Sequence, residues 1–184
     1  IGGLSTKFRY EEKLDRGVAE PDGGARGTAN VLGNSLPGLV AVVLFAAAEH
    51  SMFPADPAVF QYAFAGSMAT ALGDTLSSEI GGLYDAPRLV TSFERVEPGT
   101  DGAVTWQGEL AGVAGSAVIA GLGVGLFSLP AVGGLVVVAG GIAGMTADSL
   151  LGAVIEGGVV GNQSVNFLAT GTGAAAGGLL ALLL

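Results

Sequence analysis

The sequence predicts an all-α fold, a polytopic bundle of transmembrane helices with about five spans and two cytoplasmic loops. Composition is the first observation behind this fold class: 50% of the 184 residues are hydrophobic and only 12% are charged. A soluble domain carries about 25% charged residues. The mean hydropathy of +0.63 agrees with a membrane location. The 33 glycines are a further observation, because small residues let helices approach closely in lipid.

Five stretches approach the length of about 20 apolar residues that crosses the hydrocarbon core of a bilayer. They are residues 31–48, 58–76, 110–129, 131–151 and 165–184. Pro130 separates the third stretch from the fourth, which indicates a tight connection. A pair of buried helices in a soluble protein imitates one such stretch, but hardly five. We therefore expect one membrane-embedded domain over residues 1–184.

The basic residues predict the orientation of these spans. All seven Lys and Arg residues lie in segments 1–30 and 82–109. If each stretch crosses the membrane once, both segments lie on the same side, which the positive-inside rule makes cytoplasmic. A third, short loop on that side would cover residues 157–164. The sequence thus predicts a multi-pass protein of the cell membrane with its polar loops in the cytoplasm.

Composition and missing motifs exclude several classes of function. The chain has no cysteine and a single histidine, His50, which rules out thiol catalysis and zinc sites built from Cys or His. A net charge of −9 disfavours nucleic acid as a partner. No GxxxxGK[ST] motif is present, so the chain has no P-loop. The many acidic residues and the shortage of lysine suggest a halophilic, archaeal source.

Two aspartates near the ends of apolar stretches are the first candidates for a functional site. Asp74 begins the triplet D-T-L and Asp148 the triplet D-S-L, each at the end of the second helix of a predicted hairpin. A carboxylate at the centre of a span costs about 2.5–3.5 kcal/mol and is a functional candidate by default. On a helix each aspartate shares a face with small residues, so another backbone or a ligand can come close. The alternative is that both aspartates bond to helix ends or reach out to the interface.

A magnesium site is the functional interpretation of these aspartates. Mg²⁺ is usually held by one or two carboxylates together with substrate phosphates. Glu79 lies five residues after Asp74, about 140° around a helix, so it would join the site from a neighbouring position.

Arginines and turn residues are candidates for binding phosphate. The forked guanidinium groups of Arg26, Arg88 and Arg95 match phosphate geometry, although basic residues also collect at the cytoplasmic face for topology alone. Gly99 and Thr100 lie in a glycine-containing turn whose backbone amides could meet a phosphate.

Several blocks, read in order, resemble one family of membrane proteins. They are residues 23–26 (GGAR) with Asn34, 69–81 (ATALGDTLSSEIG), 87–88, 95–102 (RVEPGTDG), 148–152 (DSLLG) and 162–166. Over roughly residues 5–170 the chain looks like the integral-membrane family that includes the plant phytyl-phosphate kinase of vitamin E biosynthesis. Members of this family usually have more hydrophobic sequence upstream, so we expect the chain to be truncated at its N-terminus.

The resemblance implies a phosphotransferase whose acceptor is a phosphate group. Such a kinase moves the γ-phosphate of a nucleotide, with CTP favoured over ATP, to geranylgeranyl, phytyl or farnesyl phosphate and forms the diphosphate. The catalytic residues, which also hold Mg²⁺, would be Asp74, Glu79 and Asp148. Substrate or nucleotide would be bound by Arg26, Asn34, Ser78, Arg88, Arg95, Gly99, Thr100 and Asn166. The expected partners are the nucleotide, the isoprenoid lipid phosphate and membrane lipids, with no nucleic acid, and a homo-oligomer is compatible with the sequence.

Other interpretations of the sequence stay open. A transporter of a small solute or ion would favour polar residues at the midplane and inverted repeats, whereas Asp74 and Asp148 lie at one edge in a parallel repeat. A CDP-alcohol phosphotransferase is suggested by segment 22–26, which resembles the DGxxAR opening of those enzymes but is one residue short. For Asn34 and Asn166, near the entrances of two spans, capping of a helix is the alternative to ligand contact.

Overall fold

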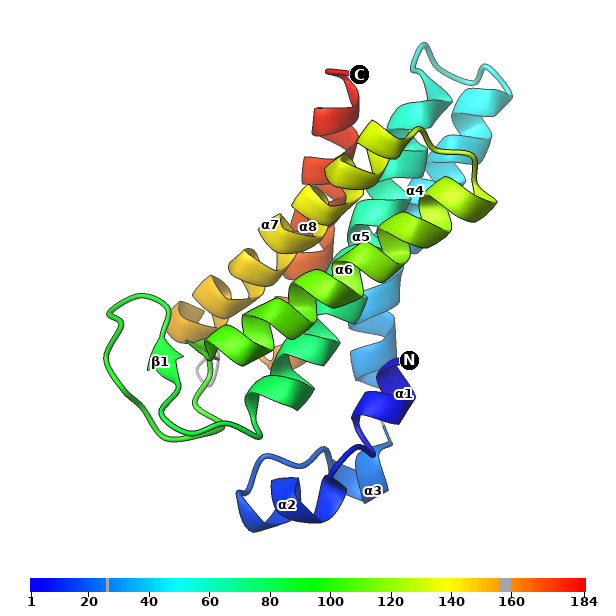
Figure 1. Cartoon of the computed structure of the whole chain (residues 1–184). Helices are drawn as coiled ribbons and strands as arrows, with labels where there is room; N and C mark the ends of the chain where they lie inside the picture. The colour runs from blue at the N-terminus through cyan, green and yellow to red at the C-terminus, as the bar shows by residue number, and fades with distance from the viewer. Residues whose placement is uncertain (26, 156–159) are drawn as a thin grey trace.

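A bundle of long helices forms the body of the protein. The computed structural model describes residues 1–25, 27–155 and 160–184. Within them the long helices are α4 (Thr28–Glu49), α5 (Pro57–Gly81), α6 (Trp106–Leu126), α7 (Ala131–Ile155) and α8 (Asn162–Ala181), as Figure 1 shows. Each overlaps one of the five predicted apolar stretches, which confirms the all-α membrane bundle.

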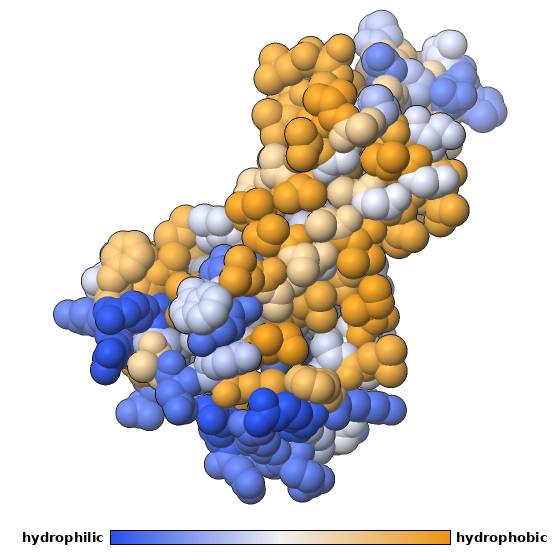
Figure 2. All heavy atoms as spheres, viewed as in Figure 1, coloured by the Kyte–Doolittle hydropathy of each residue, from blue (hydrophilic) through white to orange (hydrophobic). Residues whose placement is uncertain are grey.

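The helices differ in how well they suit a lipid environment. Among the described residues, α4, α6 and α7 are long and apolar enough to cross a membrane, and 22%, 28% and 33% of their apolar windows are buried. The less apolar α5 is the central helix, because it packs against the other four, whereas α8 packs against α4, α5 and α7 and leaves Phe167, Leu168 and Leu179 exposed. A central helix contacts protein on most sides, so α5 needs less hydropathy than a helix that faces lipid. In Figure 2 hydrophobic atoms cover the middle of the molecule, polar atoms gather at its lower end, and the upper end is polar only at its right side. That all five long helices cross the membrane stays a prediction.

Small residues allow the close crossing of α5, α7 and α8. A Cβ atom added to Gly66 would overlap the carbonyl oxygen of Gly173, and one added to Gly140 would lie 3.0 Å from the same oxygen. The Thr70 hydroxyl donates to the Gly66 carbonyl at 3.0 Å. The face of small residues that leads to Asp74 therefore accommodates the backbone of α8. The sequence predicted that either another backbone or a ligand would come close to this face.

The N-terminal segment and the segment between α5 and α6 meet at one end of the bundle, at the bottom of Figure 1, and the C-terminus lies at the other end. The Arg16 and Asp85 side chains join them at 2.7 Å. The N-terminal segment contains three short helices, α1 (Gly2–Ser5), α2 (Tyr10–Asp15) and α3 (Pro21–Gly24). A small antiparallel hairpin, β1 (Arg88–Leu89) and β2 (Ala103–Val104), belongs to the second segment.

The boundaries of the polar segments differ slightly from those expected. Helices α4 and α6 begin at Thr28 and Trp106, inside the ranges 1–30 and 82–109. Capping explains why α6 begins at Trp106, because the Thr105 side chain accepts a hydrogen bond from the Gly108 amide at 3.1 Å. The loop expected at 157–164 lies partly outside the described residues, and α8 begins within it at Asn162.

Candidate functional site

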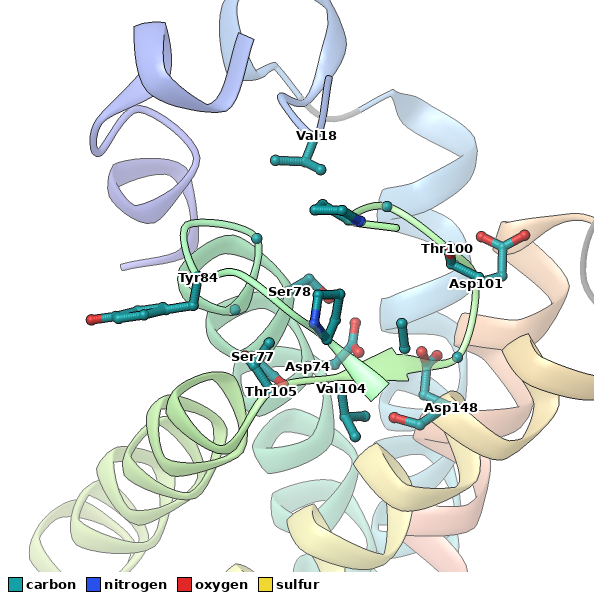
Figure 3. A pocket seen from close by; sticks show the side chains of 18 of the residues that line it. Val18, Asp74, Ser77, Ser78, Tyr84, Thr100, Asp101, Val104, Thr105 and Asp148 are labelled. Atoms are coloured by element: carbon teal, nitrogen blue, oxygen red, sulfur yellow. The ribbon is translucent and has the colours of Figure 1, made fainter. Parts of the chain in front are cut away.

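A pocket with a cavity volume of about 460 Å³ opens at the polar end of the bundle, where the N-terminal segment meets the segment between α5 and α6. Its wall is built from the N-terminal segment, the end of α5, residues 98–105, the end of α7 and the start of α8 (Figure 3). The polar residues that line it are Glu20, Asp74, Ser77, Ser78, Tyr84, Thr100, Asp101, Thr105, Asp148, Ser149 and Asn162. The pocket therefore collects polar side chains from parts of the chain that are far apart in sequence.

Asp74 and Asp148 reach this pocket from two different helices. Asp74 lies two turns before the end of α5 and Asp148 at the matching position of α7. Figure 3 shows both carboxylates directed toward the loop that carries Thr100 and Asp101. Both residues are half-buried. The structure thus brings together the two aspartates that the repeated D-[TS]-L triplets singled out.

The described lining of the pocket is strongly acidic. It includes Glu20, Asp74, Asp101 and Asp148 but no lysine, arginine or histidine. A concave surface with charges of one sign concentrates counter-ions, so the pocket favours a cation. Among the described residues, however, no three Asp, Glu, His or Cys side chains converge closely enough to hold a metal ion. A metal ion here would need further ligands from a substrate or from water.

Glu79 is placed elsewhere. It does not belong to the described lining of the pocket, and its side chain forms an ion pair with Lys13 of α2. Both side chains are buried, with 1% of Lys13 and 5% of Glu79 exposed. The offset of about 140° from Asp74 along the helix explains why Glu79 turns away from the two aspartates.

The predicted phosphate-binding arginines do not line the pocket where the structure describes them. The Nη1 atom of Arg88 donates to the Phe93 carbonyl at 2.6 Å. Arg95 borders a neighbouring depression that also contains Asp85 and Glu97. Arg26 lies outside the described residues.

The asparagines form a ladder between α4 and α8. The Nδ2 atom of Asn166 donates to the Asn162 side-chain oxygen at 3.2 Å, and Asn30 donates to the same oxygen at 3.4 Å. Asn34 donates to the Asn30 side chain at 3.1 Å. Neither Asn34 nor Asn166 caps its helix, because the N-cap residues of α4 and α8 are glycines. Asn162, the acceptor that Asn30 and Asn166 share, lines the pocket.

The loop over the aspartates is held by a tight turn and by one glycine. The Thr100 amide donates to the Glu97 carbonyl at 3.2 Å, and its hydroxyl donates to the same oxygen at 2.7 Å. That amide closes the turn instead of facing the pocket. Gly102 has a φ of +73°, and a Cβ atom added to it would overlap the Ala153 nitrogen and lie 2.5 Å from the Ser149 carbonyl oxygen. The loop therefore rests directly on the backbone of α7.

Replacing Gly102 by alanine tests this contact. We expect Gly102→Ala to lift the loop from α7 and to speed amide hydrogen exchange over residues 96–105 at least about tenfold, because both the positive φ and the contact oppose a Cβ atom. Gly23→Ala is the matched control, since Gly23 has a φ of +68° but no neighbour within 4 Å. Exchange rates in the loop that stay unchanged in Gly102→Ala would contradict the close packing.

Sequence reasoning missed several contributors to the pocket, among them Asp101, Asn162 and residues 17–20. Asp101 lies inside the glycine-containing turn that was singled out, and Asn162 begins the last resembling block, so both had a local signal. Residues 17–20 of the N-terminal segment also line the pocket. They had no such signal, because a contact between distant segments leaves no pattern in one sequence.

A bundle of apolar helices with an acidic pocket at one polar end defines an integral membrane protein whose pocket lies at the edge of the apolar zone. The sequence matches the family model "Integral membrane protein DUF92" over residues 1–174. The chain therefore belongs to this family, and the resemblance seen in its sequence blocks is confirmed at the family level.

Individual relatives come from an archaeon, a plant and a cyanobacterium. The chain is 39% identical to an uncharacterized membrane protein of Methanocaldococcus jannaschii over 98% of this chain and 71% of that protein. It is 35% identical to "Protein VTE6, chloroplastic" of Arabidopsis thaliana over 85% of this chain and 46% of that protein. An uncharacterized membrane protein of Synechocystis is 35% identical over 70% of this chain and 49% of its own length. The chain thus spans about half the length of the plant and cyanobacterial relatives. No solved structure matches.

Proposed function

We propose that this chain is the catalytic part of a membrane kinase that acts on isoprenyl monophosphates. It would transfer the γ-phosphate of a nucleoside triphosphate, with CTP favoured over ATP, to geranylgeranyl, phytyl or farnesyl phosphate. One observation carries the proposal: Asp74 and Asp148, from two separate helices, line one pocket at the polar end of a membrane bundle. Family membership supports it, because the resembling blocks belong to a family that includes a phytyl-phosphate kinase.

The chemistry of the pocket fits Mg²⁺ as the cofactor. Hard carboxylate oxygens are the ligands that Mg²⁺ prefers, and it typically takes one or two of them and completes its shell with phosphates and water. Asp74 and Asp148 would supply those carboxylates. Bound Mg²⁺ would neutralise charge on the phosphates during transfer. This need is acute here, because bare phosphates would be repelled by a described lining that holds four carboxylates and no basic side chain.

The remaining polar groups suit the positioning of phosphates. The hydroxyl group of Ser78 and the amide of Asn162 are neutral donors on the pocket wall, whereas the Ser77 hydroxyl donates to Glu109 at 3.5 Å. An oxygen of the acceptor monophosphate attacks the γ-phosphorus, and the bond to the β–γ bridging oxygen breaks, so that the nucleoside diphosphate leaves with the electron pair. Because the acceptor is already ionised, the transfer needs no strong general base, and positioning carries most of the catalysis.

The place of the pocket suits a substrate with a charged head and an apolar tail. The phosphate would meet the nucleotide at the polar end, while the isoprenoid chain would lie along the apolar helices. We place this end at the cytoplasmic face of the cell membrane, because all Lys and Arg residues of the chain belong to the two segments that meet there, 1–30 and 82–109. Soluble nucleotides are available on that side.

An assay of the purified protein in detergent or nanodiscs tests the proposal. We expect γ-labelled CTP, Mg²⁺ and geranylgeranyl phosphate to give a labelled prenyl diphosphate, and chelation of Mg²⁺ to abolish the product. Parallel reactions with ATP, and with phytyl and farnesyl phosphate, would rank the donors and acceptors. Chromatography of the extracted lipid is the measurement.

Two rival outcomes would overturn the kinase proposal. Release of CMP from a CDP-alcohol, with transfer of its phosphoalcohol group, would identify a CDP-alcohol phosphotransferase. A folded protein that forms no diphosphate with any donor and acceptor, but moves a solute or ion across a liposome membrane, would identify a transporter.

A further inference from the structure

The buried ion pair between Lys13 and Glu79 lies outside the described lining of the pocket, and the proposed transfer does not use it. The Lys13 ammonium donates to Glu79 and to the Ser5 carbonyl at 2.7 Å. Both charged side chains are almost completely buried. Burial of two charges is costly and persists only when their partners are well placed. The pair therefore fixes α2 firmly against the end of α5.

The chain that follows Lys13 becomes one wall of the pocket. Residues Gly17, Val18, Ala19 and Glu20 line it. Val18 packs between the end of α5 and the loop of residues 98–105. A Cβ atom added to Gly82, the C-cap of α5, would lie 3.1 Å from one Val18 methyl group, and one added to Gly99 of the loop would lie 3.4 Å from the other. The Val18 amide also donates to the Lys13 carbonyl at 2.9 Å, so the position of Lys13 is transmitted to Val18 through the backbone.

We infer that Lys13 and Glu79 are a positioning pair: they hold residues 17–20 against α5 and so complete the pocket for substrate. Glu79 acts through Lys13 and does not touch the reacting phosphates. The effect on substrate binding rests on the proposed kinase function, whereas the docking of the segment does not. The two statements are therefore tested separately.

Engineered cysteines measure the docking without any enzyme assay. The chain has no cysteine of its own, and a Cβ atom at Gly82 would lie 3.5 Å from the Val18 Cβ, within the range of a disulfide. We expect Val18→Cys/Gly82→Cys to cross-link readily on mild oxidation. Adding Glu79→Gln should slow that cross-link at least about tenfold, because a buried ammonium loses its counter-charge. An unchanged rate would overturn the proposal.

A second cysteine pair is the matched control. A Cβ atom at Gly178 would also lie 3.5 Å from that of Ala63, in the contact of α5 with α8. Ala63→Cys/Gly178→Cys should cross-link at the same rate whether or not Glu79→Gln is present. A parallel fall in both rates would mean that Glu79 supports the whole bundle, and this would also overturn the proposal.

Kinetics then separate positioning from chemistry. We expect Glu79→Gln to raise KM at least about tenfold with little change in kcat, the signature of lost binding shared by ground and transition states. Closing the 18–82 disulfide in the same variant should return KM to that of the cross-linked Val18→Cys/Gly82→Cys protein that keeps Glu79. Loss of kcat that persists with the disulfide closed would make Glu79 a catalytic group and overturn the proposal. If no variant and no parent protein makes diphosphate, the kinase proposal fails while the cross-linking still decides the docking.

Discussion

We expect Asp74→Asn and Asp148→Asn each to lower kcat of the proposed kinase at least about 100-fold, because removing a direct metal ligand should exceed the 10–100-fold cost of changing its supporting shell. Both substitutions keep the size of the side chain and remove its charge, so the helices should keep their positions. The measurement is diphosphate formation at saturating donor and acceptor, over a range of Mg²⁺ concentrations. Partial recovery at high Mg²⁺ is expected, since a weakened site is refilled by mass action.

The control for these variants removes a carboxylate at the other end of the bundle. Asp56 is the N-cap of α5 and accepts a hydrogen bond from the Ala58 amide at 2.9 Å. Asparagine caps a helix as well as aspartate does, so Asp56→Asn should preserve both activity and thermal stability. Full activity of Asp74→Asn or Asp148→Asn at low Mg²⁺ would remove that residue from the metal site.

The sequence predicted the bundle because membrane helices leave a strong signal. Lipid forces each span to be a long, nearly uncharged helix, so the five apolar stretches coincide with α4 to α8. It could not predict that α5 lies at the centre, because α5 differs from the other long helices only modestly in hydropathy. That arrangement depends on the contacts of Gly66, Gly140 and Gly173, and a glycine-rich sequence offers many equivalent crossings.

The candidate site was predictable where its residues repeat, and unpredictable where it depends on contacts between distant segments. Asp74 and Asp148 occupy matching places in two parallel hairpins, so helix geometry alone brings both to one edge. The pairing of Glu79 with Lys13 joins residues 66 positions apart, and the sequence around each residue does not indicate its partner. Arg88 and Arg95 were chosen for charge, but the β-hairpin that holds them sets their position.

Gly66→Ala is expected to destabilise the folded bundle by about 2–3 kcal/mol, a cost in the range typical of overpacking. Its Cβ atom would overlap the carbonyl oxygen of Gly173 and lie 3.1 Å from the carbonyl carbon. These are backbone atoms of α8, so a side-chain rotation cannot relieve the overlap and the helices must separate. The loss should appear despite the gain of up to about 1 kcal/mol that alanine brings to a helix.

Unfolding by SDS in mixed micelles, followed by circular dichroism, measures this loss, and Gly121→Ala is its matched control. Gly121 also lies within a long helix, α6, but has no neighbour within 4 Å, so its variant should be as stable as the parent protein or slightly more stable. Equal stability of the Gly66→Ala and Gly121→Ala variants would contradict the close crossing of α5 and α8. A loss specific to Gly66 would show that backbone contact between α5 and α8, more than their hydropathy, holds the α5 segment that carries Asp74 in place.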